Sequence, residues 1–210
     1  MVVIDATMLL LLLRPDDAGV PLDPTTNAPV ADFHERLAYW IEETERAGTK
    51  IIIPTPALSE VLIRAGATGP AIVEELRNFS VFEIASFDAM EAIELAAMTR
   101  EDMNAREKRE GLSPTATWAK LKYDRQIVAT ARVRQATTIY TDDEDIKTFG
   151  ARAGIGVVAL HELPKRPMPP QTDWVAEGIG AAVIDNGEML VLPAPAEPVD
   201  GASNAEEKDA

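Results

Sequence analysis

Cysteine is missing from this 210-residue chain, and histidine occurs only at His34 and His161. The lack of cysteine excludes disulfides, zinc–thiolate sites, iron–sulfur clusters and thiol catalysis. Two histidines are also few for a histidine-based triad or a multi-histidine metal site. Any catalytic or metal-binding chemistry must therefore draw mainly on other side chains, and carboxylates are the abundant ones.

Basic residues are scarce relative to acidic ones, with 20 Lys and Arg against 35 Asp and Glu and a formal net charge of −15. A field of this sign repels nucleic acids and anionic membranes. A polyanionic substrate would therefore require local basic groups or bound cations. Carboxylates are the usual ligands of hard divalent cations, so the acidic excess suits a metal site.

The sequence also lacks a hydrophobic run long enough to cross a bilayer. The apolar stretch 8–13 is far too short, and a secretory signal would need a basic segment before it, whereas the first charge is Asp5. Hydrophobic residues make up 46% of the chain, so a packed core is feasible. We expect a cytoplasmic protein that does not associate with membranes.

Proline and charge divide the chain near Pro164. Seven of the fifteen prolines lie from this residue onward, together with nine acidic and three basic residues. Such a composition is typical of a segment with little packed core. We expect one domain over residues 1–163 and an acidic, proline-rich extension over 164–210, largely disordered from about residue 193.

Short β-branched runs alternate with longer amphipathic segments through residues 1–163. The runs predict strands at 2–4, 51–53, 81–84, 137–140 and 156–159. The amphipathic segments predict helices at 31–47, 55–64, 70–78, 87–105, 113–135 and 143–153. Continuous apolar strands separated by helices indicate an α/β fold whose parallel sheet is covered on both faces.

Two of these predicted helices rest on particular residues. Ser113-Pro114 has the form of a capping serine followed by proline at the first helical position. In the helix over 87–105, Ile93 and Ala97 are expected to share one apolar face with Ala96.

Acidic residues lie where the predicted topology brings them to one edge of the sheet. Asp5 directly follows the first strand, and Asp143 lies three residues beyond the fourth. Glu60 lies about 7 Å up a helix that starts at that edge. Asp124 lies in the middle of a helix antiparallel to the fourth strand, which brings it level with the same edge. Like charges gather poorly without a cation, so a divalent metal is the simplest explanation.

Four short segments occur in order along the chain: IDAT at 4–7, LSEVL at 58–62, YD with IVATA at 123–131, and TDDEDI at 141–146. Together they resemble the PIN domain family, including the VapC-type toxin ribonucleases. The resemblance covers about residues 1–160. It implies a three-layer α/β/α fold with a central five-stranded parallel sheet, in which the first strand lies between the second and the fourth.

The resemblance further implies an endoribonuclease that depends on Mg²⁺ or Mn²⁺ and serves as the toxin of a toxin–antitoxin pair. Its substrate would be RNA, and an antitoxin protein and a second copy of the chain are candidate partners. The residues implied for the site are the catalytic and metal-binding acids Asp5, Glu60, Asp124 and Asp143, the auxiliary metal ligand Asp145, and the lining residues Thr7 and Thr141.

Simpler interpretations stay open for these acids. Asp5 could cap a helix, and Asp124 could pair with Lys120, four residues before it. The acids at 142–145 could be favoured by the dipole of a helix N-terminus. Lys120 and its basic neighbours Lys122 and Arg125 could contact RNA phosphates or form a solvated face.

Two other functions are also open. A catalytically idle PIN-like module would keep the fold and bind protein or RNA. A phosphohydrolase of the haloacid-dehalogenase type would use Asp5 as its nucleophile. That chemistry needs a second acid two residues later, and position 7 is Thr, so the phosphohydrolase is disfavoured.

Overall fold

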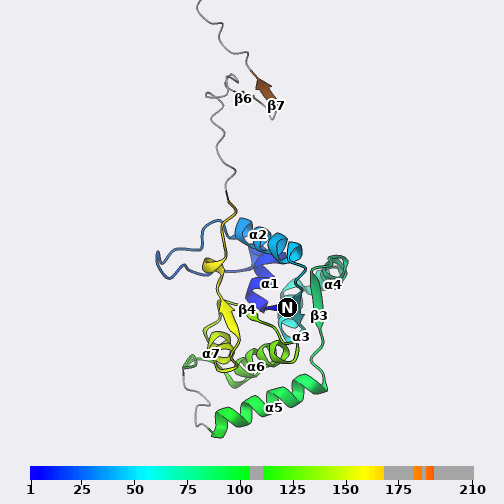
Figure 1. Cartoon of the computed structure of the whole chain (residues 1–210), viewed down its shortest axis with the longest axis vertical. Coiled ribbons are helices and arrows are strands. Elements are labelled where there is room, and N and C mark those ends of the chain that lie inside the picture. The colour runs from blue at the N-terminus through cyan, green and yellow to red at the C-terminus, as the bar shows by residue number, and fades with distance from the viewer. Residues whose placement is uncertain (105–110, 168–181, 186–187, 192–210) are drawn as a thin grey trace, which may run out of the picture. The chain divides into compact units, whose positions relative to one another are not determined.

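The computed structural model describes residues 1–104, 111–167, 182–185 and 188–191. Its main sheet has five parallel strands in the order β3-β2-β1-β4-β5. Figure 1 labels β3 and β4 of this sheet and shows α4 (Gly69–Asn78) beside β3. The strands are β1 (Val2–Ile4), β2 (Ile51–Pro54), β3 (Phe82–Ala85), β4 (Thr138–Tyr140) and β5 (Gly156–Val158). The predicted five-stranded parallel sheet is therefore confirmed, with the first strand between the second and the fourth.

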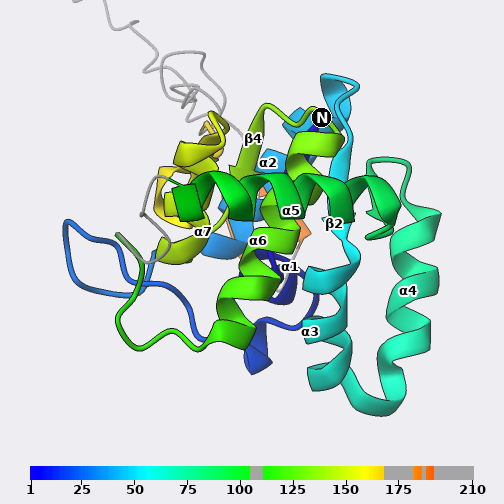
Figure 2. The ribbon, with the colours of Figure 1, turned by 90° about the horizontal axis from the view of Figure 1, so that it is seen from below.

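Helices connect the successive strands, as parallel pairing requires. They are α1 (Ala6–Leu13), α2 (Phe33–Arg46), α3 (Thr55–Ala65), α4 (Gly69–Asn78), α5 (Ala89–Asn104), α6 (Trp118–Val133) and α7 (Glu144–Arg152). Figure 2 shows α5 crossing α6, and α3 beside α4. Each strand therefore leads into a helix at the same edge of the sheet, where the candidate residues lie.

Strand side chains alternate between two cores, one on each face of the sheet. Val3 and Ile52 pack with residues of α5, α6 and α7. Ile4 and Ile51 pack with residues of α1, α2, α3 and α4. All four strand residues are fully or almost fully buried. The predicted three-layer α/β/α arrangement is therefore confirmed.

The predicted start of the long helix at Ser113 is wrong. The helix α6 begins at Trp118, and its N-cap is Thr117, whose Oγ1 accepts a hydrogen bond from the backbone N–H of Lys120 at 3.1 Å. Ser113 instead lies in a turn, where its backbone N–H donates to Asp145 Oδ1 at 2.6 Å. A tertiary hydrogen bond thus outweighs the local capping signal.

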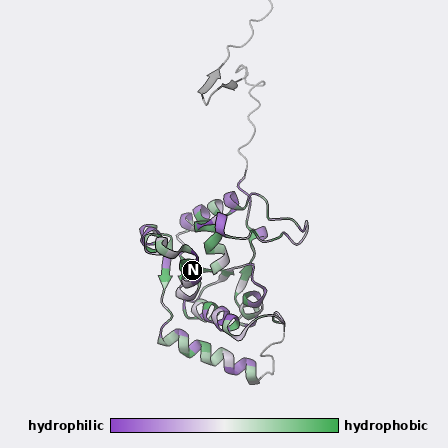
Figure 3. Ribbon diagram, turned by 180° about the vertical axis from the view of Figure 1, so that it is seen from behind, coloured by the Kyte–Doolittle hydropathy of each residue, from purple (hydrophilic) through white to green (hydrophobic). Residues whose placement is uncertain are grey.

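The apolar face predicted for α5 is not its buried face. Ile93 is 65% exposed, whereas Glu91 and Met98 are buried. Glu91 accepts a hydrogen bond from the backbone N–H of Asp88 at 3.1 Å and pairs with Arg134 of the loop after α6 at 3.7 Å. In Figure 3 this helix, at the bottom of the ribbon, carries both hydrophobic and hydrophilic residues along its length. The face of α5 toward α6 therefore carries the core residue Met98 together with Glu91, which pairs with Arg134.

The chain divides into two compact units, Met1–Arg166 and Pro167–Ala210. In the second unit, β6 (Ala182–Asp185) pairs antiparallel with β7 (Glu188–Val191). The disorder predicted from about residue 193 lies outside the described residues, and the proposed division at residue 164 stays a prediction. Among the described residues, no helix is long and apolar enough to cross a membrane.

Candidate functional site

Asp5 stands at the carboxyl end of β1 and is also the N-cap of α1. Its Oδ1 accepts a hydrogen bond from the backbone N–H of Met8 at 2.8 Å. The carboxylate is 1% exposed. The capping role that the sequence left open is therefore present, and it holds a buried acid at the edge of the sheet.

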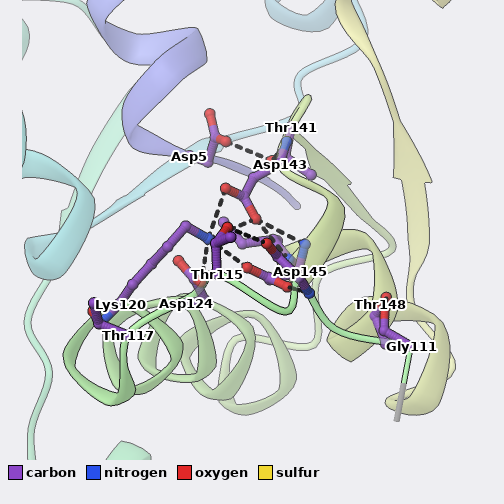
Figure 4. A network of polar contacts seen from close by, with 12 residues as sticks. Asp5, Gly111, Thr115, Thr117, Lys120, Asp124, Thr141, Asp143, Asp145 and Thr148 are labelled. Atoms are coloured by element: carbon purple, nitrogen blue, oxygen red, sulfur yellow. Dashed lines mark hydrogen bonds and ion pairs between the residues drawn. The ribbon is translucent and has the colours of Figure 1, made fainter. Parts of the chain in front are cut away.

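A threonine joins Asp5 to the acids that follow β4. The Thr141 hydroxyl donates to Asp5 Oδ2 at 2.5 Å, and Thr141 Oγ1 accepts a hydrogen bond from the backbone N–H of Asp143 at 2.9 Å (Figure 4). Thr141 is fully buried. These bonds connect the ends of the adjacent strands β1 and β4 and fix the backbone at Asp143.

Three carboxylates come together beside this connection. Asp124 lies on α6, Asp143 is the N-cap of α7, and Asp145 lies in the first turn of α7. Each offers one carboxylate oxygen, and these oxygens all lie within 4.8 Å of one another. We call these three residues the acid cluster. Asp124 and Asp145 are buried, and Asp143 is half-buried, so the cluster has one side toward solvent.

The backbone around α7 holds two of these carboxylates in place. Asp143 Oδ1 accepts hydrogen bonds from the backbone N–H groups of Asp145 at 2.8 Å and Ile146 at 3.1 Å. Asp145 Oδ1 accepts the hydrogen bond from Ser113 described above. Helix α7 and the turn before α6 therefore orient the cluster before any ligand arrives.

The side chain of Lys120 reaches into the acid cluster. Its Nζ lies 2.7 Å from Asp124 Oδ2, 2.8 Å from Asp145 Oδ2 and 2.9 Å from Asp143 Oδ2. Figure 4 shows this side chain extending from α6 across to the carboxylates. One ammonium therefore touches all three acids.

Burial raises the pKa of two acids on this edge. It raises the pKa of Asp5 to about 7, against the hydrogen bonds from Met8 and Thr141, which lower it. Burial also raises the pKa of Asp124 to about 6, although the hydrogen bond from Lys120 opposes the change. Both carboxylates are thus costly to charge in the metal-free protein.

Asp145 behaves differently, although it is also buried. Burial alone would raise its pKa, but the hydrogen bonds from Lys120 and the backbone of Ser113 lower it below its ordinary value. Burial opposes the charge on Lys120 too, yet the hydrogen bonds to the acid cluster raise the pKa of this lysine above its usual value. The ammonium of Lys120 and the carboxylate of Asp145 therefore stabilise each other in the charged form.

Glu60 and Thr7 lie apart from the acid cluster. They line a shallow hollow between α1 and α3, together with Arg64. Burial raises the pKa of Glu60, and the charges of Lys120 and Asp143 also act on this carboxylate. Glu60 therefore lies within electrostatic reach of the cluster without contributing to its close contacts.

The structure thus brings together only part of the predicted set. Asp124 and Asp143 meet, and Asp145, predicted as an auxiliary ligand, joins them as an equal member. Asp5 is linked to the group through Thr141. The sequence leaves open a pairing of Lys120 with Asp124, and this pair is present. The contacts of Lys120 with Asp143 and Asp145 cannot be predicted from the spacing of residues along the helix.

The cluster has the donor set that a hard divalent cation prefers. Mg²⁺ binds carboxylate oxygens at about 2.0–2.1 Å, so opposite ligands stand about 4.2 Å apart. The oxygens of the acid cluster lie within 4.8 Å, a spacing that small side-chain rotations would close. The ammonium of Lys120 already lies between these oxygens. The residues present therefore fit such an ion.

Comparison with solved structures finds distant similarity to chains of VapBC and VapC structures. The chain is 14% identical to a chain of VapBC2 from Rickettsia felis bound to a promoter DNA fragment, with a TM-score of 0.48, covering 76% of this chain and 98% of that one. It is 16% identical to a chain of DNA-bound VapBC from Salmonella typhimurium, with a TM-score of 0.48 and coverages of 76% and 97%. It is 12% identical to Mycobacterium tuberculosis VapC20, a Sarcin-Ricin loop cleaving toxin, with a TM-score of 0.42, covering 71% of this chain and 95% of that one.

Comparison with curated proteins gave no match. The sequence model of the PIN domain matches residues 26–151, more than half of the chain. The matched segment contains every residue of the acid cluster and begins after Asp5. On this match, the chain belongs to the PIN domain family.

Proposed function

We propose that this protein is an endoribonuclease of PIN type that depends on Mg²⁺ or Mn²⁺. The observation that carries the proposal is the acid cluster, in which separate elements present three carboxylate oxygens within 4.8 Å. Membership of the PIN domain family supports a nuclease. RNA as substrate follows from the resemblance of the sequence motifs to the VapC-type ribonucleases.

Within this proposal, Asp124, Asp143 and Asp145 hold the ion. Asp5 stays a proposed member of the site, and its bond to Thr141 gives it a positioning role toward Asp143. Glu60 stays a proposed member at the more exposed side, where its charge interacts with Asp143. Thr7 lines the hollow beside Glu60.

A bound divalent ion would supply an activated water molecule and neutralise charge on the scissile phosphate. The buried carboxylates orient that chemistry toward the open side of the cluster, where Asp143 is partly exposed. The hydrogen bonds from the N-terminus of α7 keep Asp143 in place. The proposal requires neither cysteine nor a catalytic histidine.

The same resemblance proposes partners. A VapC-type toxin would be held by an antitoxin protein, and a gene for a small DNA-binding antitoxin next to this one would support that assignment. A homodimer also stays a prediction. Sedimentation of the full chain alone and with the neighbouring gene product would test both.

A catalytically idle PIN-like module is the second candidate. The observation that favours it is Lys120, because an ammonium among the three acids neutralises part of their charge without a metal. The haloacid-dehalogenase alternative loses its support, since the chain belongs to the PIN domain family and carries Thr at position 7.

Cleavage of mixed RNA by the full chain, with Mn²⁺, with Mg²⁺ and with excess chelator, tests the proposal. We expect cleavage with either metal and none in chelator. Asp143→Asn should abolish it, whereas Glu144→Gln, which changes an exposed neighbour paired with Lys147, should not. Cleavage that persists in chelator would remove the metal mechanism. A protein that binds RNA without cutting it under any condition would establish the idle module.

A further inference from the structure

The ammonium of Lys120 lies between the three carboxylates of the acid cluster. Its three ammonium hydrogens match three carboxylates, with Nζ to oxygen distances of 2.7 to 2.9 Å. A divalent ion and this ammonium cannot share that point, because both need the same carboxylate oxygens and carry charge of the same sign. The two cations must therefore exclude one another.

The local charge does not balance while the lysine is in place. Three carboxylates face one ammonium. One ammonium lowers the repulsion without cancelling it. A divalent ion would neutralise more of the charge, so exchange of the lysine for the metal is electrostatically favourable once the metal is abundant enough.

The side chain of Lys120 is also accessible to solvent. Its side chain is 40% exposed, whereas Asp124 and Asp145 are 7% and 2% exposed at theirs. The carboxylates are therefore the fixed part of the site and the lysine the part with access to solvent. Glu60, on the neighbouring helix α3, interacts electrostatically with Lys120 and offers it an acidic partner outside the cluster.

We propose that Lys120 is an internal competitor for the metal: its ammonium fills the cation position between Asp124, Asp143 and Asp145 in the metal-free protein and must leave when a divalent ion binds. This inference rests on the proposed metal-dependent function. It adds that the lysine sets the metal concentration at which the site loads, and that it holds the metal-free acids together.

The first test measures Mn²⁺ binding to the full chain by isothermal titration calorimetry. Lys120→Met keeps most of the side-chain volume and removes the charge. We expect the Kd for Mn²⁺ to fall at least about tenfold, while the melting temperature of the metal-free variant falls below that of the wild type. Added Mn²⁺ should raise the melting temperature of the variant more than that of the wild type.

The matched control is Lys122→Met, which makes the same change of net charge two residues along the helix. Lys122 is exposed and lines a groove with Leu95 and Trp118, away from the acid cluster. Its loss should leave the Kd for Mn²⁺ within about twofold, because exposed charges at a distance are screened by salt. A gain in affinity at Lys122→Met equal to that at Lys120→Met would overturn the proposal.

The second test follows the wild-type chain, and a variant serves only to assign one signal. The sequence contains seven lysines, and nuclear magnetic resonance of their ammonium groups can follow each during Mg²⁺ titration. The Lys120 signal, identified by its loss in Lys120→Arg, should be protected from exchange without metal and lose that protection as Mg²⁺ saturates.

The outcomes separate this inference from the proposed function. Equal or weaker Mn²⁺ binding by Lys120→Met, or a Lys120 signal unchanged while Mg²⁺ binds, overturns the competitor role and leaves the metal site standing. Absence of Mn²⁺ binding by the wild type and both variants overturns the metal site and the competitor together.

Discussion

Two consecutive residues of α6, Asp124 and Arg125, belong to two different clusters of charged side chains. Asp124 is one of three carboxylates that share the ammonium of Lys120. Arg125 donates to Asp102 of α5 at 2.7 Å, and Arg152 of α7 donates to the same carboxylate at 3.2 Å. Among the described residues, the carboxylate of Asp102 therefore joins two guanidinium groups.

The two clusters also differ in the groups that surround them. The guanidinium of Arg125 lies 4.5 Å from the ring centre of Phe149, so an aromatic face adds to its stabilisation. These contacts tie α5, α6 and α7 together, which is a structural role. The acid cluster instead keeps an excess of negative charge beside solvent. In the proposed function, a divalent cation would neutralise this excess.

The largest expected effect is on activity at the acid cluster. Asp124→Asn removes one proposed metal ligand and keeps the size of the side chain. Mutation of a residue that only supports a metal ligand typically lowers metal affinity or activity about 10- to 100-fold. Loss of a ligand itself should therefore lower RNA cleavage by more than about 100-fold. The metal-free melting temperature at pH 8 should stay equal or rise, because burial disfavours the charged form of Asp124. Full activity of this variant would argue against the metal site.

The next largest effect is expected on stability, at the group of Arg125, Arg152 and Asp102, which we call the arginine cluster. Asp102→Asn removes the charge that two guanidinium groups share, and breaking a buried ion pair on one side costs about 3 kcal/mol or more. For a chain of this size that corresponds to a fall of roughly 6 to 12 °C in melting temperature. Circular dichroism with excess chelator measures it. RNA cleavage below the transition should be retained. An unchanged melting temperature would mean that the cluster does not hold the helices together.

A smaller effect should follow pH. Burial raises the pKa of Asp5 to about 7 and that of Asp124 to about 6, so the folded protein takes up protons more readily than the unfolded chain. The stability linked to these groups is fully present below their unfolded pKa and is lost as pH rises through 6 and 7. In chelator the melting temperature should therefore fall between pH 5 and pH 8.

The carboxylates whose pKa is lowered, such as Asp145, have finished most of their titration below this interval and do not reverse the trend. Asp5→Asn should flatten the pH dependence and preserve the fold. A melting temperature that rises from pH 5 to pH 8 in the wild type would contradict the prediction.

The smallest effect belongs to an exposed ion pair next to the acid cluster. Glu144 is 79% exposed at its side chain and pairs with Lys147 at 2.8 Å. Exposed pairs of this kind contribute about 0.5 kcal/mol or less, so Glu144→Gln should shift the melting temperature by no more than about 1 to 2 °C. RNA cleavage and Mn²⁺ binding should stay at wild-type levels. A larger change in either would show that the proposed site extends beyond the three acids.

Local sequence determined most of the fold. Strands such as 2–4 and 51–53 are short runs of β-branched residues that are buried on both faces, and no other element suits them as well. The position of Asp5 after the first strand and of Asp143 after the fourth then follows, because parallel strands end at one edge of a sheet. Family membership and the acidic edge were therefore predictable from the chain alone.

Tertiary structure decided which groups touch. Ser113 carries a helix-start signal but donates its backbone N–H to Asp145, and Ile93 has helical periodicity but faces solvent. Both results come from partners far away in sequence. A helix cap contributes about 1 kcal/mol, and a tertiary hydrogen bond contributes about as much, so a distant partner can outweigh a local signal.

Sequence and tertiary structure also each determine a different part of the acid cluster. Spacing placed Asp124 near the carboxyl edge because rise per residue is a property of the backbone. It could not decide that Asp145 closes on the cluster while Glu60 stays outside, or that Lys120 bridges three acids. Those contacts depend on a few ångströms between α3, α6 and α7, and the packing of the whole domain sets these distances.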